Sequence, residues 1–257
     1  MPVGILDGKK ILITGVLTDT SIAFGVARVA QEEGAEIILT GAGRGLSITA
    51  RTAKKLPTLP EVLELDITNQ DHIASVRETL KEKWGTVDGA LHAIGYAPPS
   101  CLGDDFMDCD WEDVSTAIHI STYSFKALAD VVVPLMDNGG SIVGLDFDAT
   151  NSWPAYGWMG VAKAGLESTS RYLARQLGPK NIRVNLIAAG PIKTIAAKSI
   201  PEFQQFEDGW NPQSPLGWDV FDTEPVAKST VALLSDFFPS TTGEMIHVDG
   251  GFHSTGA

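Results

Sequence analysis

The chain has 257 residues, 44% of them hydrophobic and 20% charged, a composition typical of a soluble globular protein with a sizeable core. Its formal net charge of −13 argues against nucleic acid as a partner, because binding to phosphates needs a basic footprint. We expect no membrane span, since no apolar run reaches about 18 residues, and we expect a cytoplasmic location, since the N-terminus lacks a secretory pattern.

Short β-rich runs alternate with helical patterns from one end of the chain to the other. Residues 21–34 form one helical pattern, Asn69 is placed to cap another, and a third covers 224–234. Strands that alternate with helices of this length indicate βαβ units. We therefore predict an α/β fold, a single doubly wound, Rossmann-type domain over residues 1–257 with a seven-stranded parallel sheet. The predicted strands are KKILIT (9–14), AEIILT (35–40), VLELD (62–66), VDGALHAIG (87–95), GSIVGLDFD (140–148), IRVNLIAAG (182–190) and EMIHVDG (244–250).

The turn after the first predicted strand, TGVLTDTSIAFG, lacks the usual G-x-G-x-x-G dinucleotide fingerprint. Gly15 supports a tight turn, and Ser21 stands where the next helix begins. A serine there can cap the helix and offer hydroxyl and amide groups to a pyrophosphate. Taken alone this pattern is weak, because a helix cap without a ligand explains it equally well.

The next three strand ends strengthen the prediction of a dinucleotide site. The second strand ends without an acidic residue, and Arg44 is placed to face a 2′-phosphate or to stack near adenine, so these residues leave NADH and NADPH open. Asp66 ends the third strand and either accepts a hydrogen bond from an adenine amine or caps a helix. Ile94 and Gly95 end the fourth strand and let the backbone approach a ribose.

Two cysteines, Cys101 and Cys109, lie eight positions apart in an acidic stretch. We interpret them as free thiols in a reducing compartment rather than as a disulfide or a metal site, and we predict no metal centre.

Tyr156 and Lys163 stand seven residues apart at the start of a helical pattern that follows the fifth strand. Two helical turns place both side chains on one face, which looks toward the carboxyl edge of the sheet. A nearby ammonium is expected to stabilise the ionised form of the phenol and so to favour proton donation. This spacing by itself is common by chance, and its place in a cofactor-binding fold makes it informative.

The connection after the sixth strand, about 191–223, spans 33 residues. Connections of this length in compact domains are usually lids or substrate loops. It begins where ligands bind in open α/β sheets. Its apolar residues suit a hydrophobic ligand, and we predict that it is a substrate-binding loop.

The residues from Arg171 to Lys198 include six basic residues and no acidic one. Such a stretch is either a docking surface for an anionic partner or a set of solvated and subunit-contact positions.

Several segments of the chain carry a family resemblance, among them ITGVLTDTSIAFG, LELDITN, DGALHAIGYAP, GSIVGLDFDA, PAYGWMGVAKAGLES and IRVNLIAAGPIKTIA. They resemble the NADH-dependent enoyl-acyl-carrier-protein reductases of the short-chain dehydrogenase/reductase superfamily, particularly the actinobacterial members. Ketone reductases of that superfamily carry Tyr-x3-Lys and a serine about a dozen residues before the tyrosine. In this chain Gly160 stands where that lysine would be, the spacing is Tyr-x6-Lys, and residues 142–145 contain no hydroxyl.

The resemblance implies an oxidoreductase of fatty acid biosynthesis that reduces the trans-2 double bond of an enoyl thioester with NADH rather than NADPH. It implies catalytic roles for Tyr156 at the thioester oxygen, Lys163 at the cofactor ribose and Phe147 beside the substrate. The implied cofactor contacts are Gly15, Ser21, Ile22, Asp66, Ile67, Ile94, Gly95, Lys163, Ile192 and Thr194. The implied substrate contacts are Tyr156, Phe147, Met159, Ile200 and Phe203.

The resemblance also implies a homotetramer and an acidic partner, acyl carrier protein, for which the Arg171–Lys198 stretch is the candidate docking surface. Two alternatives stay open. One is a carbonyl-reducing short-chain dehydrogenase, disfavoured by the missing serine. The other is a dinucleotide-binding regulator without turnover, disfavoured by the intact Tyr156 and Lys163.

Overall fold

The computed structural model describes residues 3–103 and 105–256. Within these residues seven parallel strands form one sheet in the order β3-β2-β1-β4-β5-β6-β7. The predicted fold class is confirmed, and each predicted strand is found with ends shifted by a few residues. The strands are β1 (Lys10–Ile13), β2 (Glu36–Gly41), β3 (Glu61–Glu64), β4 (Gly89–His92), β5 (Gly140–Asp146), β6 (Ile182–Ala189) and β7 (Met245–Val248).

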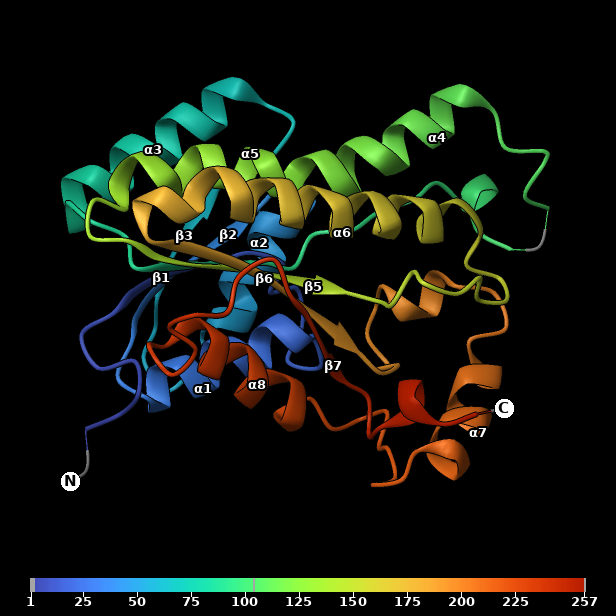
Figure 1. Ribbon diagram of the computed structural model, residues 1–257. Helices are drawn as coiled ribbons and strands as arrows, with labels where there is room; N and C mark the ends of the chain where they lie inside the picture. The colour runs from blue at the N-terminus through green and yellow to red at the C-terminus, as the bar shows by residue number, and fades with distance from the viewer. Residues whose placement is uncertain (1–2, 104, 257) are drawn as a thin grey trace.

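Helices cover both faces of the sheet (Figure 1). One face carries α3, α5 and α6, and the other carries α1, α2 and α8. The helices are α1 (Ile22–Glu32), α2 (Arg44–Ala53), α3 (Gln70–Trp84), α4 (Trp111–Ile118), α5 (Ser124–Val132), α6 (Gly157–Leu177), α7 (Gln204–Gln213) and α8 (Glu224–Leu234).

The alternating pleat of the strands explains the two hydrophobic layers. Leu12 points into the core shared with α3, α5 and α6, whereas its neighbours Ile11 and Ile13 point into the core shared with α1 and α8. All three side chains are fully buried. Because both faces are covered, the strands read as continuous apolar runs rather than as alternating patterns.

Local signals set the helix boundaries that the sequence predicts. Asn69 caps α3, since its side-chain oxygen accepts hydrogen bonds from the backbone N–H groups of Asp71 and His72. None of the described helices combines the length and the apolar character that crossing a membrane would require.

The chain order reverses between β1 and β4, so the sheet opens a crevice at the carboxyl ends of these strands. Figure 1 shows α7 beyond that edge. The connection 191–223, predicted as a loop, therefore contains a helix. The physical reason is the spacing of Phe206 and Trp210, whose side chains lie one turn apart and are both buried.

Candidate active site

One pocket of about 900 Å³ lies along the carboxyl edge of the sheet. Its walls come from the segments that follow β1 to β6, including the connection that contains α7. All fifteen residues that the sequence predicts for the site line this one pocket, although their individual roles stay predictions. They are Gly15, Ser21, Ile22, Asp66, Ile67, Ile94, Gly95, Phe147, Tyr156, Met159, Lys163, Ile192, Thr194, Ile200 and Phe203.

Gly15 lets two strand ends approach each other at the pocket wall. Its φ of +81° lies in the region that favours glycine. A Cβ built on Gly15 would lie 2.1 Å from the carbonyl oxygen of Ala93, which follows β4. Any other residue would push the two segments apart. Bare backbone therefore lines this wall, as the close approach of a pyrophosphate or a ribose requires.

Local hydrogen bonds hold two polar residues of the predicted cofactor end. Ser21 occupies the N-cap position of α1, but its hydroxyl donates to the carbonyl oxygen of Thr18 at 2.6 Å. The predicted side-chain cap is therefore wrong, because the preceding turn offers a nearer partner. Asp66 accepts hydrogen bonds from the hydroxyl and the N–H of Thr68, which lower the pKa of Asp66. Asp66 thus stabilises its turn and lines the pocket as a carboxylate.

Tyr156 and Lys163 reach the pocket from the start of α6. Tyr156 directly precedes the first helical residue, Gly157. Ala155, one position earlier, has a φ of +57°, which a residue with a Cβ rarely adopts. Strain of this kind costs about 1–3 kcal/mol and is concentrated at functional sites. The local backbone therefore favours a functional role for this segment.

The Tyr156 side chain is packed in the interior, 7% exposed, with its ring edge-on to Phe147 at a centroid distance of 5.1 Å. Burial raises the pKa of Tyr156 above its ordinary value of 10.0, and the charge of Asp146 raises it further. The expectation that Lys163 stabilises an ionised phenol is therefore wrong, because burial and Asp146 dominate. Tyr156 keeps its proton at neutral pH and is available as a hydrogen-bond donor.

The end of β5 anchors Lys163. Its ammonium donates a hydrogen bond to the carbonyl oxygen of Leu145 at 2.9 Å. It also lies 3.8 Å from Oδ1 of Asp146, a distance that makes an ion pair but is too long for a hydrogen bond. Burial lowers the pKa of Lys163, and Asp146 opposes that shift.

Asp146 is a site residue that the sequence analysis missed. Its side chain is fully buried and, among the described residues, neither carboxylate oxygen has a hydrogen-bond partner. Burial raises the pKa of Asp146 to about 7, while Lys163 opposes the shift. An available signal was the Asp itself, placed inside the apolar run GSIVGLDF that ends at Phe147. A charged residue in a buried strand needs a reason, and Lys163 supplies it.

We expect Asp146→Asn to remove a pH dependence of stability between about pH 4 and pH 7. The unfolded carboxyl loses its proton near its ordinary value of 3.8, whereas the folded one keeps it to about pH 7. The folded protein therefore binds more protons in this window, and the free energy of unfolding falls as the pH rises through it. At about 1.4 kcal/mol per pKa unit, the free energy of unfolding of the wild type falls by a few kcal/mol relative to that of the variant over this window.

Denaturant unfolding of both proteins over a pH series measures that difference. The control is Asp137→Asn, at an exposed position in the loop before β5. If the difference in the free energy of unfolding between the wild type and Asp146→Asn stays constant from pH 4 to 7, the interpretation of Asp146 as a buried carboxyl with a raised pKa is contradicted.

The other end of the pocket is apolar. Phe203 and Phe206 contact each other at a ring distance of 5.9 Å, and Phe206 lies edge-on to Phe147 at the same distance. Ile192 and Met159 complete this wall from the segment after β6 and from α6. Such a surface suits a hydrocarbon chain.

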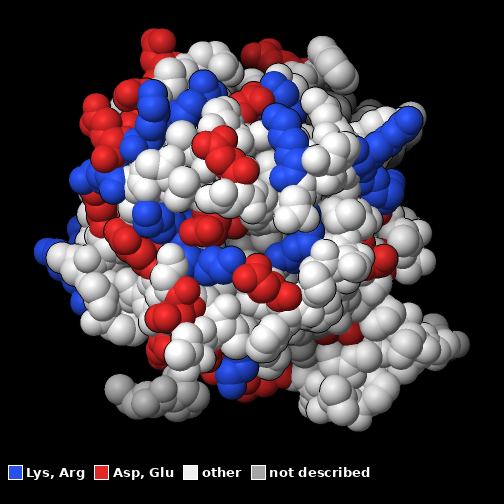
Figure 2. Space-filling model, turned by 60° about the vertical axis from the view of Figure 1, so that its left-hand side comes forward, with Lys and Arg blue, Asp and Glu red and all other residues white. Residues whose placement is uncertain are grey.

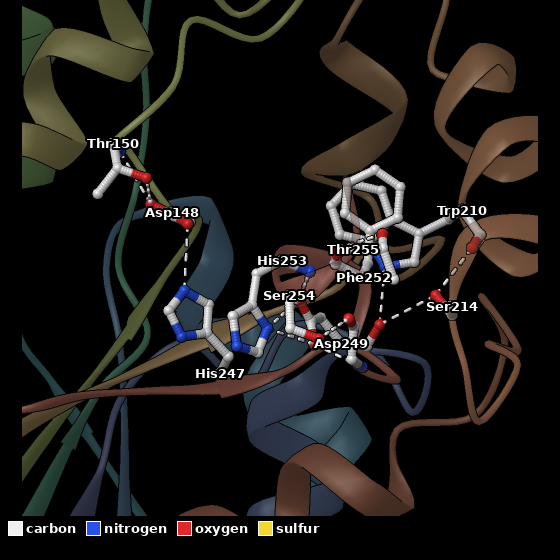
Figure 3. A network of polar contacts seen from close by, with 11 residues as sticks. Asp148, Thr150, Trp210, Ser214, His247, Asp249, Phe252, His253, Ser254 and Thr255 are labelled. Atoms are coloured by element: carbon white, nitrogen blue, oxygen red, sulfur yellow. Dashed lines mark hydrogen bonds and ion pairs between the residues drawn. The ribbon is translucent and has the colours of Figure 1, made fainter. Parts of the chain in front are cut away.

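A polar network closes a second, smaller cavity of about 420 Å³ behind this aromatic wall (Figure 3). His247 on β7 contacts Asp148 at 3.1 Å and stacks on His253 at 3.8 Å, and His253 contacts Asp249 at 2.9 Å. Trp210 on α7 donates to the carbonyl oxygen of Asp249. The network joins the segment after β5 to β7, α7 and the C-terminal segment and so fixes the position of the wall. No cluster of three metal-ligating side chains occurs in the part of the chain that the structure describes.

Comparisons with known proteins give one consistent match. The family described as Enoyl-(Acyl carrier protein) reductase matches residues 15–253. The enoyl-[acyl-carrier-protein] reductase [NADH] of Mycolicibacterium smegmatis is 47% identical, over 96% of this chain and 97% of that protein. The protein of the same name from Mycobacterium avium is 44% identical over the same shares. Enoyl-[acyl-carrier-protein] reductase [NADH] 1 of Rhizobium meliloti is 40% identical, over 98% and 93%.

Proposed function

This chain belongs to the enoyl-(acyl carrier protein) reductase family of short-chain dehydrogenases, and we propose that it reduces the trans-2 double bond of enoyl-acyl-carrier-protein thioesters with NADH. That reaction is the last step of the fatty acid elongation cycle. The observation that carries the proposal is the meeting of Tyr156 and Lys163 in one pocket, between a backbone-lined end and an apolar end.

The pocket fits a dinucleotide at its backbone-lined end. Gly15 exposes backbone there, Asp66 presents a carboxylate at the tip beyond β3, and Lys163 presents a buried ammonium. Arg44, the candidate for a 2′-phosphate, begins α2 between the lining residues Ala42 and Gly45, and the names of the relatives favour NADH over NADPH. Bound NADH supplies a hydride to the β-carbon of the enoyl chain.

The chain's own residues stabilise the charge that then develops on the thioester oxygen. Tyr156 keeps its proton and donates a hydrogen bond to that oxygen, as an oxyanion-hole donor does. Lys163 binds the cofactor ribose, and the buried Asp146 carboxyl lies 3.8 Å from its ammonium. Phe147 packs against Tyr156 and holds its ring in place beside the substrate.

An assay with crotonyl-CoA and a ketone control, with NADH and with NADPH, tests this function against its alternatives. We expect consumption of NADH that depends on the enoyl substrate. Consumption with the ketone alone would favour a carbonyl reductase. No consumption with either substrate would favour a regulator without turnover.

The proposal extends to assembly, location and the substrate segment. The segment 191–223 covers the acyl chain, with Ile200 and Phe203 in the pocket lining as support. The protein is a cytoplasmic homotetramer. Its apolar side chains Trp111 and Tyr172, 74% and 70% exposed on α4 and α6, support pairing between copies, and light scattering measures the assembled mass.

The basic stretch Arg171–Lys198 does not form one surface. The eight-residue strand β6 separates Lys180 from Lys193. The two halves of the basic stretch therefore lie at opposite ends of the parallel strands. The Arg183 guanidinium donates hydrogen bonds to the carbonyl oxygens of Leu233 and Ser235, and the Lys193 ammonium pairs with Glu207 at 2.8 Å. Both cations therefore already have partners within the chain. On the face toward the left of Figure 1, where α6 ends, basic and acidic side chains are interleaved (Figure 2).

Lys198 is the exposed cation of the stretch that stands beside the pocket, between its lining residues Ala197 and Ser199. We propose that acyl carrier protein docks there. We expect Lys198→Glu to raise the KM for a carrier-linked enoyl substrate about fivefold, as a rim charge typically does, and to leave the KM for the CoA substrate unchanged. Arg175→Glu, at the other end of the parallel strands, is the control. Equal effects on both substrates would remove the docking proposal.

A further inference from the structure

The two cysteines lie together next to Leu102, which lines the pocket. Cys101 is 2% exposed and ends a short 3-10 helix, η1 (Pro99–Cys101), while Cys109 is half-buried. Both are free thiols, yet their sulfur atoms are only 2.7 Å apart. That is about 0.7 Å more than the ~2.05 Å of a disulfide bond, so joining them needs little movement of the chain.

The segment between the cysteines is attached to the start of α6, which carries Tyr156. The N–H of Gly103 donates to the carbonyl oxygen of Ala155 at 2.9 Å. Gly157 packs so closely on the carbonyl oxygen of Cys101 that a Cβ there would lie 2.7 Å from it.

A second attachment lies further along the same segment. Trp158 stacks on Phe106 at 4.6 Å and donates to its carbonyl oxygen. Leu102, beside Cys101, lines the pocket. A constraint on the cysteines therefore reaches the substrate side of the site.

The two thiols differ in reactivity. Burial and the contact with Cys109 raise the pKa of the Cys101 thiol above its ordinary value. Cys109 is the more exposed sulfur and meets a solute first. This asymmetry matches the division between an attacking and a resolving cysteine.

We propose that Cys101 and Cys109 form a redox-active dithiol that a peroxide converts to an intramolecular disulfide at the rim of the substrate pocket. The Cys109 sulfur attacks hydrogen peroxide, the O–O bond breaks, and a sulfenic acid and water form. The Cys101 sulfur then attacks the Cys109 sulfur, the S–S bond forms, the S–O bond breaks, and a second water leaves. The two thiols give up two electrons and one peroxide takes them.

The disulfide closes a loop of nine residues and ties Leu102 to the start of α6. Loop closure of this length is expected to raise Tm by about 5 °C. It is also expected to raise the KM for the enoyl substrate several-fold and to leave the KM for NADH unchanged, since the loop lies on the substrate side. The predicted change in KM rests on the proposed function, whereas the intact mass and the Tm are measured without any substrate.

The test compares the reduced full-length protein with the same protein treated with hydrogen peroxide. We expect intact mass to show the loss of two hydrogens, alkylation to find no free thiol, and dithiothreitol to restore both thiols. Cys109→Ser should show no loss of hydrogen and no rise in Tm. Cys101→Ala should stop at a sulfenic acid on Cys109, which dimedone traps, so the proposal stays testable if one variant folds poorly.

Two outcomes would overturn the proposal. One is a wild-type protein that still has two alkylatable thiols after a peroxide treatment that is strong enough to produce the sulfenic acid in Cys101→Ala. The other is a disulfide that forms between chains. If the reduced protein is active and the disulfide leaves the KM for the enoyl substrate unchanged, the coupling between the disulfide and the pocket is overturned. If the reduced protein is inactive, the result counts against the proposed function instead.

Discussion

Replacing Tyr156 with phenylalanine is expected to lower kcat about 100-fold while the KM for NADH stays close to the wild-type value. The change removes one hydroxyl and keeps the ring that packs on Phe147. An oxyanion-hole donor contributes about 100- to 1000-fold to kcat, because it acts on charge that develops only in the transition state. The rate of NADH consumption with crotonyl-CoA measures the effect.

The control for this variant is Tyr172→Phe, on the same helix α6 but 70% exposed. It should match the wild type. A loss in Tyr156→Phe that appears only as a higher substrate KM, with kcat unchanged, would show that the hydroxyl binds the substrate without stabilising the transition state.

Replacing Lys163 with methionine is expected to raise the Kd for NADH about 100-fold or more. Each hydrogen bond from a charged donor is worth about 1.5–3 kcal/mol, and the variant loses those to the cofactor. It also leaves Asp146 buried without its partner, a change that typically destabilises a protein by about 3–5 kcal/mol. Titration of NADH fluorescence measures the first effect, and denaturant unfolding the second.

A double variant, Lys163→Met with Asp146→Asn, separates the two effects. It removes the unpaired carboxyl, so most of the lost stability should return while NADH binding stays weak. Lys180→Met, an exposed cation just after α6, is the control for charge alone. Recovery of NADH binding in the double variant would contradict a direct role of Lys163 at the cofactor.

The pattern of the chain predicted the fold because the relevant signals are local. The seven strands are short apolar runs bounded by helical patterns, and the Asn69 cap needs only the backbone N–H groups of Asp71 and His72, two and three positions later. The same holds for part of the site. Residues that directly follow parallel strands meet at one edge of a sheet, so Gly15, Asp66 and Ile94 were expected together before any contact was known.

Other features of the site depend on contacts between distant segments. Asp146 shows this most clearly: its place in an apolar run marks it as unusual, but only the packing around it shows that it is buried, that burial raises its pKa, and that Lys163 is its partner. The network of His247 and Asp148 joins positions 99 residues apart, and no local pattern predicts that contact.

The sequence by itself thus determined the order of strands and helices, the positions that face the cofactor edge, and the Tyr-x6-Lys pair, because each follows from periodicity or spacing along one segment. The tertiary structure alone decided the protonation of Tyr156, the splitting of the basic stretch by β6, and the contact between Cys101 and Cys109. Burial and electrostatic interactions depend on distances in space, and the packing of separate segments sets these distances.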